Sequence, residues 1–251
     1  KDAASDGEVI IEQYEKLGEE AFRRLDGEFA IVLVDYTQRF LYLCTDNFAT
    51  KPMWMARDKN RYCISSYESV LKNLGFENRT KISENRLVKF DLDTMNIISV
   101  QKLREFDINN QHKKTFDDWI LAFENSIRKR TESVRETIFI GLSGGYDSGA
   151  IACELMKGKV PFKAYSIRAQ ENEDVILERH KVLENHYREY EGEVIYLSEN
   201  EFSTAKRNLK QNAEEFLYQI KRNGIITPNE YMTDDKGSVG LSFICEKASS
   251  E

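Results

Sequence analysis

The chain centres on the stretch IFIGLSGGYDSGA, residues 138–150. An apolar, β-branched run gives way to glycines, a carboxylate and small hydroxyls, and apolar residues at helical spacing resume at residues 151–156. This order predicts a strand, a tight loop and a helix. The N–H groups of such a loop and of the helix's first turn form an anion-binding nest. The stretch therefore predicts a phosphate site, in which we expect Gly144 and Gly145 to take positive φ and approach the ligand closely.

Three side chains of this loop are candidates for ligand binding. The hydroxyls of Ser143 and Ser148 are candidate donors to phosphate. Asp147 is a candidate Mg²⁺ ligand, because a carboxylate beside a phosphate is repulsive unless a divalent cation lies between them. A structural alternative is an ordinary helix N-cap, for which Ser and Asp are preferred. The loop lacks the Lys of a Walker phosphate loop, so phosphate transfer of the kinase type is not expected.

Composition narrows the class of protein. With 251 residues, 41% of them hydrophobic, the chain can form one large domain or two ordinary ones, and we favour two. Lys and Arg number 36 against 43 Asp and Glu, for a net charge of −7, so no nucleic-acid partner is expected. Apolar runs are too short to span a bilayer, which predicts a soluble, cytoplasmic protein. Both ends look truncated, since the chain begins with Lys1 and ends with Glu251.

Cysteines and histidines show no metal-ligand spacing. We expect the cysteines to be buried free thiols and the histidines to be solvated surface residues. The residues concerned are Cys44, Cys63, Cys153, Cys245, His112, His180 and His186.

The two halves have different patterns. Before residue 103, short helices precede a series of hairpins, and the nearly continuous apolar run at residues 28–35 predicts a strand that is buried on both faces. A polar segment at residues 103–117 predicts a domain boundary. After the central loop, we expect a strand at 162–167, a helix at 173–190, a strand at 194–197 and helices over 199–221. This alternation predicts a parallel, Rossmann-like sheet with ligand at the carboxyl ends of its strands.

Four motifs carry a family resemblance. They are SDGEVI at residues 5–10, LDGEFA at 25–30, DNFATKPMW at 46–54 and SGGYDS at 143–148. In this order they resemble the glutamine-hydrolysing asparagine synthetases. The resemblance implies an α+β fold for residues 1–112, as the C-terminal portion of a glutaminase-like domain of the N-terminal-nucleophile αββα type. For residues 113–251 it implies an α/β Rossmann-like ATP-pyrophosphatase domain, incomplete at its C-terminus.

The resemblance also implies roles for single residues. The backbones of Leu142 and Ile167 would hold the adenosine of ATP, and the loop of Ser143, Gly144, Gly145 and Ser148 would hold its phosphates. Asp147 and Asp174 would bind Mg²⁺, and Asp6 would receive the α-amino group of glutamine. The structural alternatives are a helix-terminal carboxylate for Asp174 and a helix-cap residue for Asp6.

The implied reaction is amide synthesis in asparagine biosynthesis. The enzyme would adenylate a small carboxylate, most simply aspartate, release pyrophosphate, and transfer ammonia from glutamine. Its partners would be glutamine and the carboxylate, with a homodimer as one assembly state. A nucleophilic N-terminal cysteine should lie upstream of Lys1, and a second nucleotide motif, Ser-Gly-Glu-Gly-x-Asp-Glu, should follow Glu251.

Two departures from the family leave alternatives open. TDDKGSVG at residues 233–240 resembles the acceptor segment Thr-Thr-x-Arg-Ala-Ser-x-Gly, which assigns Lys236, Ser238 and Gly240 to the acceptor pocket. Lys236 stands where the family has Arg, and the two are not interchangeable in carboxylate recognition. A ligase of the β-lactam synthetase type, with another acceptor and no glutaminase activity, is one alternative, and an inactive nucleotide-binding homologue is another. Ala49 also replaces a usual glycine in the Asp-x-x-Gly-x-Lys-Pro turn.

Overall fold

The chain divides into two compact units, residues 1–111 and 112–251. The computed structural model describes residues 6–59, 61–168, 172–213, 217–218, 221–222, 225–226 and 230–250. The division lies inside the polar segment at residues 103–117. Each unit has its own sheets and its own core.

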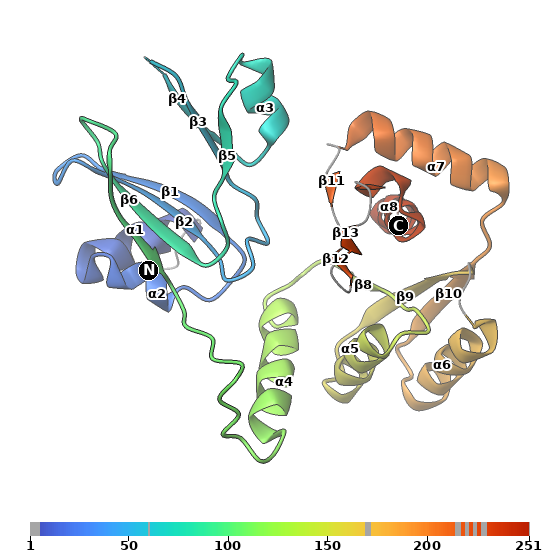
Figure 1. Cartoon of the computed structure of the whole chain (residues 1–251). Helices are drawn as coiled ribbons and strands as arrows, with labels where there is room; N and C mark the ends of the chain where they lie inside the picture. The colour runs from blue at the N-terminus through green and yellow to red at the C-terminus, as the bar shows by residue number, and fades with distance from the viewer. Residues whose placement is uncertain are drawn as a thin grey trace. The chain divides into compact units, whose positions relative to one another are not determined.

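Unit 1 is a mixed α+β structure. Helices α1 (Asp6–Leu17) and α2 (Glu20–Arg24) precede a four-stranded antiparallel sheet of order β1-β2-β6-β7. Its strands are β1 (Ala30–Asp35), β2 (Phe40–Thr45), β6 (Arg86–Asp91) and β7 (Ile97–Lys102). A second antiparallel sheet has the order β4-β3-β5, with helix α3 beside it (Figure 1). These elements are β3 (Trp54–Arg57), β4 (Tyr62–Ser65), α3 (Glu68–Asn73) and β5 (Arg79–Lys81).

The core of unit 1 lies on both faces of strand β2. Alternate side chains of a strand point to opposite faces. On the face of α1 and α2, a cluster contains Phe22, Tyr42, Cys44, Leu87 and Leu103. On the other face, a cluster contains Leu41, Leu43, Met53, Val88 and Phe90. The two interior strands of this sheet, β2 and β6, therefore have buried side chains on both faces.

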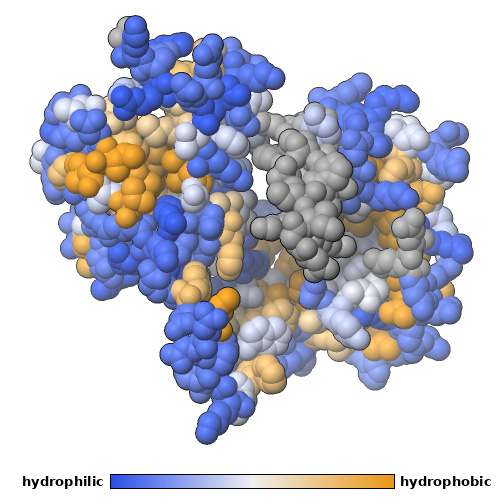
Figure 2. Space-filling view, in the orientation of Figure 1, coloured by the Kyte–Doolittle hydropathy of each residue, from blue (hydrophilic) through white to orange (hydrophobic). Residues whose placement is uncertain are grey.

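Strand β1 corrects one prediction. We expected residues 28–35 to be buried on both faces, but β1 is an edge strand in which Val32 is 48% and Val34 37% exposed. Val32 pairs with Leu43, Leu43 with Val88, and Val88 with Val100, so one apolar row crosses the whole sheet. Figure 2 shows apolar residues gathered in a patch over this sheet. A hydrophobic run indicates a strand, but it does not reveal how many layers cover that strand.

Unit 2 contains a three-stranded parallel sheet of order β10-β9-β8. The alternating elements are α4 (Asp117–Thr131), β8 (Ile138–Gly141), α5 (Tyr146–Lys157), β9 (Phe162–Ile167), α6 (Glu173–His186), β10 (Glu191–Ile195) and α7 (Glu199–Asn212). One face of the sheet packs on α5 and α6 through a cluster that includes Leu142, Leu155 and Leu183. The opposite face packs on α8 (Lys236–Ser250) through Tyr165, Ile195 and Ile244 (Figure 1). The predicted order of strand, loop and helix around residue 142 is confirmed.

Some boundaries in unit 2 differ from the predictions. Helix α6 ends at His186 rather than at residue 190, and β10 covers residues 191–195 rather than 194–197. Helix α7 ends at Asn212, whereas helix was expected up to residue 221, and short extended segments follow it. These are β11 (Leu217–Tyr218), β12 (Lys221–Arg222), β13 (Ile225–Ile226) and β14 (Glu230–Tyr231), before the short 3-10 turn Met232–Asp234. β11 pairs with β14. Local secondary-structure propensity does not predict this pairing, because the paired residues are distant in the sequence.

The cysteines are only partly as predicted. Cys44 is fully buried, and burial raises the pKa of its thiol to about 12. Cys63 is half-buried, but Cys153 and Cys245 are exposed, so their predicted burial is wrong. Both exposed thiols lie in helices. A continuous apolar run in a helix includes residues on the solvent-facing side as well as on the buried side. In the part of the chain that the structure describes, no helix has the length and apolar character needed to cross a bilayer.

Candidate functional site

Two serines close the loop between β8 and α5. The backbone N–H of Ser143 donates to Ser148 Oγ at 3.0 Å, and the two hydroxyl oxygens are 2.9 Å apart. The N–H of Gly145 donates to Ser143 Oγ at 3.1 Å. Because these bonds join the two ends of the loop, the hydroxyls shape its backbone in addition to being candidate donors to a ligand. The first turn of α5 follows directly, and a helix N-terminus favours anions.

The glycines of the loop do not take positive φ. Among the described glycines, Gly18 and Gly75 have positive φ, whereas Gly145 is extended, with φ −74° and ψ 155°. The prediction of left-handed glycines at 144 and 145 is therefore wrong. Space is the reason for glycine at 145, since a Cβ there would lie 3.2 Å from Ser143 Oγ. The loop is tight because its side chains fold back onto the backbone.

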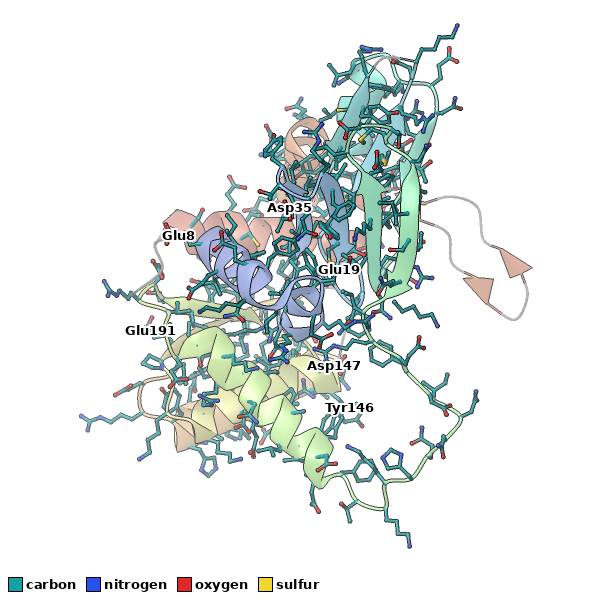
Figure 3. The ribbon with its side chains drawn as sticks, turned by 90° about the vertical axis from the view of Figure 1, so that its left-hand side faces the viewer. Glu8, Glu19, Asp35, Tyr146, Asp147 and Glu191 are labelled. Carbon is teal, nitrogen blue, oxygen red and sulfur yellow. The ribbon has the colours of Figure 1, made fainter. Side chains whose placement is uncertain are left out.

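Asp147 lies in the first turn of α5. It is the second residue of the helix and is exposed, beside Tyr146, which is 92% exposed (Figure 3). The N-cap residue is Gly145, which makes no side-chain cap bond. The alternative in which a Ser or Asp of this loop caps the helix is therefore wrong. An exposed carboxylate at the start of a helix remains accessible to a cation.

Asp174 has the same position on the next helix. It is the second residue of α6, and its backbone N–H donates to the N-cap side chain of Asn172 at 3.0 Å. Helices α5 and α6 follow the neighbouring parallel strands β8 and β9, whose carboxyl ends lie at one edge of the sheet. Asp147 and Asp174 therefore occupy the same edge. Among the described residues, no group of three or more His, Cys, Asp or Glu side chains could hold a metal ion by itself.

The residues predicted to hold adenosine lie at the carboxyl ends of the neighbouring strands β8 and β9. Leu142 follows β8, is buried, and donates its N–H to Tyr165 O at 2.8 Å. Ile167 is the last residue of β9, two positions beyond Tyr165. Gly240 of α8 packs here, since a Cβ on it would lie 3.2 Å from Ile167 Cδ1. The fold thus brings Leu142, Ile167 and Gly240 to the same edge of the sheet.

The predicted acceptor segment forms the start of α8. The Ser238 N–H and hydroxyl donate to Asp235 Oδ2 at 2.7 and 3.1 Å, while Lys236 is exposed. Asp234 forms ion pairs with Lys206 and Lys210 of α7 at 2.8 and 2.9 Å. Hydrogen bonds from these two lysines lower the pKa of Asp234. Asp235 therefore fastens the start of α8, and Asp234 joins this segment to α7.

Arg179 and His180 of α6 are site residues that the sequence analysis missed. Arg179 donates to the carbonyl oxygens of Ser143, at 2.5 Å, and Gly145. His180 is only 6% exposed, so its prediction as a solvated residue is wrong. Burial lowers the pKa of His180. A signal was available, because the buried residues Ile176, His180, Leu183 and Tyr187 recur at helical spacing.

Asp46 organises a second site, in unit 1. The side chain is 4% exposed and accepts the N–H groups of Phe29 at 3.1 Å, Phe48 at 2.9 Å and Thr50 at 3.2 Å. The Thr50 hydroxyl donates to it at 3.1 Å. Burial acts to raise the pKa of Asp46, but hydrogen bonds from Phe48, Thr50 and Phe29 outweigh it, so the pKa is lowered. One carboxylate thereby joins the LDGEFA and DNFATKP motifs.

Ala49 has a left-handed backbone in this turn, with φ 49°. A residue with a Cβ is strained there by about 1–2 kcal/mol, whereas glycine is not, although glycine loses more entropy on folding. We expect Ala49→Gly to raise the free energy of unfolding by about 0.5–1 kcal/mol. Urea denaturation measures the change. Ala30→Gly in β1 is the control and should destabilise the protein; a loss of stability in Ala49→Gly would contradict the prediction.

Asp6, the predicted glutamine ligand, is the first residue of α1. The placement of its side chain lies outside the described part of the structure, so its role stays a prediction.

Comparison with known proteins gives a family match in unit 1. Residues 1–73 match the family described as a glutamine amidotransferase domain. This range includes the SDGEVI, LDGEFA and DNFATKPMW motifs and the turn around Asp46.

Most of the chain is similar to glutamine-hydrolysing asparagine synthetases. It is 25% identical to the enzyme of Rattus norvegicus over 95% of this chain and 45% of the relative. It is 26% identical to that of Gallus gallus, over 88% of this chain and 43% of the relative, and 24% identical to that of Bos taurus, over 77% and 40%. The chain therefore spans 40–45% of the length of these relatives. The resemblance to this family is confirmed.

Proposed function

We propose, from the match of residues 1–73 to a glutamine amidotransferase domain, that this chain carries sites of an ATP-dependent amidotransferase of the asparagine synthetase type. One observation carries the proposal. The Ser143–Ser148 loop joins a parallel strand to a helix in the same chain as the amidotransferase-like region. A phosphate loop and a glutaminase-like region in one chain suit an enzyme that activates a carboxylate and supplies it with ammonia.

The fold of each unit supports this assignment. We assign unit 2 to the Rossmann-like ATP-pyrophosphatase type, supported by its parallel sheet with α5 and α6 on one face and α8 on the other. We assign unit 1 to a partial glutaminase-like αββα domain. Support comes from its antiparallel sheet, which has helices on one face and an apolar opposite face.

ATP would bind at the carboxyl edge of the parallel sheet. The backbones of Leu142 and Ile167, which end adjacent strands, would hold the adenosine. The Ser143–Ser148 loop and the first turn of α5 would hold the phosphates with backbone N–H groups and hydroxyls. ATP binding is thus proposed for a place where parallel sheets commonly bind ligands.

Asp147 and Asp174 are the proposed ligands of a Mg²⁺ ion that accompanies ATP. They fit this ion, because Mg²⁺ in nucleotide sites takes one or two carboxylates together with phosphate oxygens and water. When bound, the ion would neutralise negative charge on the phosphates.

The proposed reaction has two halves. A substrate carboxylate attacks the α-phosphorus of ATP, pyrophosphate leaves, and an acyl-adenylate forms. Ammonia from glutamine then displaces AMP and leaves an amide. Loop N–H groups that face the phosphates would stabilise the negative charge on the leaving pyrophosphate. Asp6 would hold the α-amino group of glutamine while its side-chain amide is hydrolysed to supply this ammonia.

Aspartate is the proposed acceptor. The residue at position 236 also supports a second candidate, a different carboxylate acceptor. Lys236 replaces the family's Arg, and an ammonium cannot make the two parallel bonds that a guanidinium makes to a carboxylate. This favours an acceptor other than aspartate, as in ligases of the β-lactam synthetase type. Pyrophosphate formation that depends on L-aspartate would support the first candidate, and formation with a different carboxylate alone would support the second.

Calorimetric titration of the 251-residue chain with nucleotides tests the proposal. In the presence of Mg²⁺, we expect ATP to bind at least about tenfold more tightly than AMP, because the loop would engage the β- and γ-phosphates. GTP is the control for adenine recognition. Equal affinities for ATP and AMP would contradict a phosphate-binding role for the loop.

A further inference from the structure

Two consecutive residues of α6 are linked to the backbone around the loop at residues 142–145, Arg179 directly and His180 through Ser166. Arg179 Nη1 donates to the Ser143 carbonyl at 2.5 Å and also to the Gly145 carbonyl. Its guanidinium lies against α5, where a Cβ on Gly149 would be 3.0 Å from Arg179 Cζ. Glycine at position 149 therefore leaves room for the Arg179 guanidinium, which a Cβ would crowd.

His180 reaches the same backbone through Ser166 of β9. Ser166 Oγ donates to the Leu142 carbonyl at 2.5 Å and lies 2.7 Å from His180 Nε2. A hydroxyl has one hydrogen, so Ser166 must accept its second bond, and His180 Nε2 must carry a proton. In the neutral ring Nδ1 is then an acceptor, which receives the hydroxyl of Tyr190. A buried chain thus leads from Tyr190 through His180 and Ser166 to Leu142.

We propose that Arg179 and His180 are positioning residues that hold the carbonyls of Leu142, Ser143 and Gly145 on the α6 side. In a trans peptide, a carbonyl and the N–H of the next residue point in opposite directions. Arg179 would therefore direct the N–H of Tyr146, which belongs to the same peptide as the Gly145 carbonyl, away from α6 and toward the space proposed for the phosphates. This inference rests on the proposed function and assigns roles to two residues of that site.

Arg179 also supplies charge to the loop. Its cation lies beside two carbonyl oxygens, whose negative ends would otherwise repel an anion. A guanidinium can bind two carbonyls because its donors are fixed in a planar fork, whereas an ammonium is a point charge. The arrangement therefore predicts that Lys cannot fully replace Arg at this position.

Variants of Arg179 test the positioning role in the full chain. We expect Arg179→Gln to weaken Mg·ATP binding by about 10- to 100-fold while adenosine affinity changes by less than about threefold, since bonds to charged groups have this strength. The affinity of Arg179→Lys for Mg·ATP should lie between that of the wild type and that of Arg179→Gln. Lys181→Gln, which removes an exposed positive charge from the same helix, is the matched control and should bind like the wild type. Equal losses for ATP and adenosine would indicate a general structural role and overturn the proposal.

Ser166→Ala tests the His180 chain, because it cuts the link to Leu142 and leaves a small side chain. Adenosine affinity should fall by about three- to tenfold, as for one hydrogen bond. In the wild type, ¹⁵N NMR of His180 should show the Nε2–H tautomer at pH 7. The Nδ1–H tautomer, or unchanged adenosine binding in Ser166→Ala, would contradict the role of His180.

Amide hydrogen exchange separates failure of this inference from failure of the proposed function. Without any nucleotide, Arg179→Gln should increase exchange across residues 143–148 relative to Lys181→Gln. If the wild type does not bind ATP but this increase occurs, the proposed function is wrong and the positioning role stands. If the wild type binds ATP and the loop of Arg179→Gln is unchanged in exchange and in affinity, the positioning role is wrong and the function stands.

Discussion

Asp147→Asn is expected to weaken the binding of Mg·ATP by about 10- to 100-fold, with little effect or a slight gain when Mg²⁺ is removed by EDTA. The reason is electrostatic. With the ion present, Asp147 is attracted to it, but without the ion the carboxylate repels the phosphates. Calorimetric titration with ATP in both conditions measures the two effects. The dependence of the mutational effect on Mg²⁺ distinguishes a metal ligand from a residue that only stabilises the helix.

Glu199→Gln is the matched control for this experiment. Glu199 is an exposed carboxylate in the first turn of α7, which follows β10, the strand that β9 separates from β8. Removing a first-turn carboxylate costs about 0.3–1 kcal/mol of helix stability by itself. The control should therefore bind Mg·ATP like the wild type. If Asp147→Asn lost affinity equally with and without Mg²⁺, Asp147 would not be a metal ligand.

Asp46→Ala is expected to lower the free energy of unfolding of unit 1 by about 3 kcal/mol. The substitution leaves the backbone donors of Phe29, Phe48 and Thr50 without their shared acceptor, and buried unpaired donors are costly. The chain has two tryptophans, Trp54 in β3 and Trp119 in α4. In a Trp119→Phe background, urea denaturation followed by Trp54 fluorescence therefore reports unit 1 alone.

The stability contributed by Asp46 should depend on pH. Its pKa is lower in the folded protein than the unfolded value of about 3.9, so the contribution is complete above that value and is lost as the pH falls below it. We expect the difference in stability between wild type and Asp46→Ala to shrink as the pH falls from 5 to 3. Asp107→Asn, at an exposed position, is the control. A difference that stays constant across this range would contradict the hydrogen-bonding role.

Prediction from the sequence worked best where local pattern decides the structure. The strand, loop and helix around residue 142 follow from an apolar run, a glycine pair and apolar residues at helical spacing, and the structure confirms them. The carboxylates at positions 147 and 174 could be placed at one sheet edge because the strands before them are parallel neighbours.

Prediction failed where distant residues decide the outcome. His180 has a polar side chain that its own helix leaves unpaired, but Ser166 of β9 and Tyr190 provide partners that allow burial. Gly145 was expected to need positive φ, yet its requirement is space beside Ser143 Oγ. Strand β1 has the composition of a buried strand, but its position at the sheet edge exposes Val32 and Val34.

The amino-acid sequence by itself determined the order of elements, the phosphate-type loop and the family resemblance, because these depend on residues that are neighbours along the chain. Only the tertiary structure decided that Arg179 and His180 reach the loop at residues 142–145 from α6. It also decided that Asp46 joins two separate motifs. The bond from Phe29 to Asp46 joins residues 17 positions apart and the bond from Arg179 to Ser143 joins residues 36 positions apart, separations that no local pattern encodes.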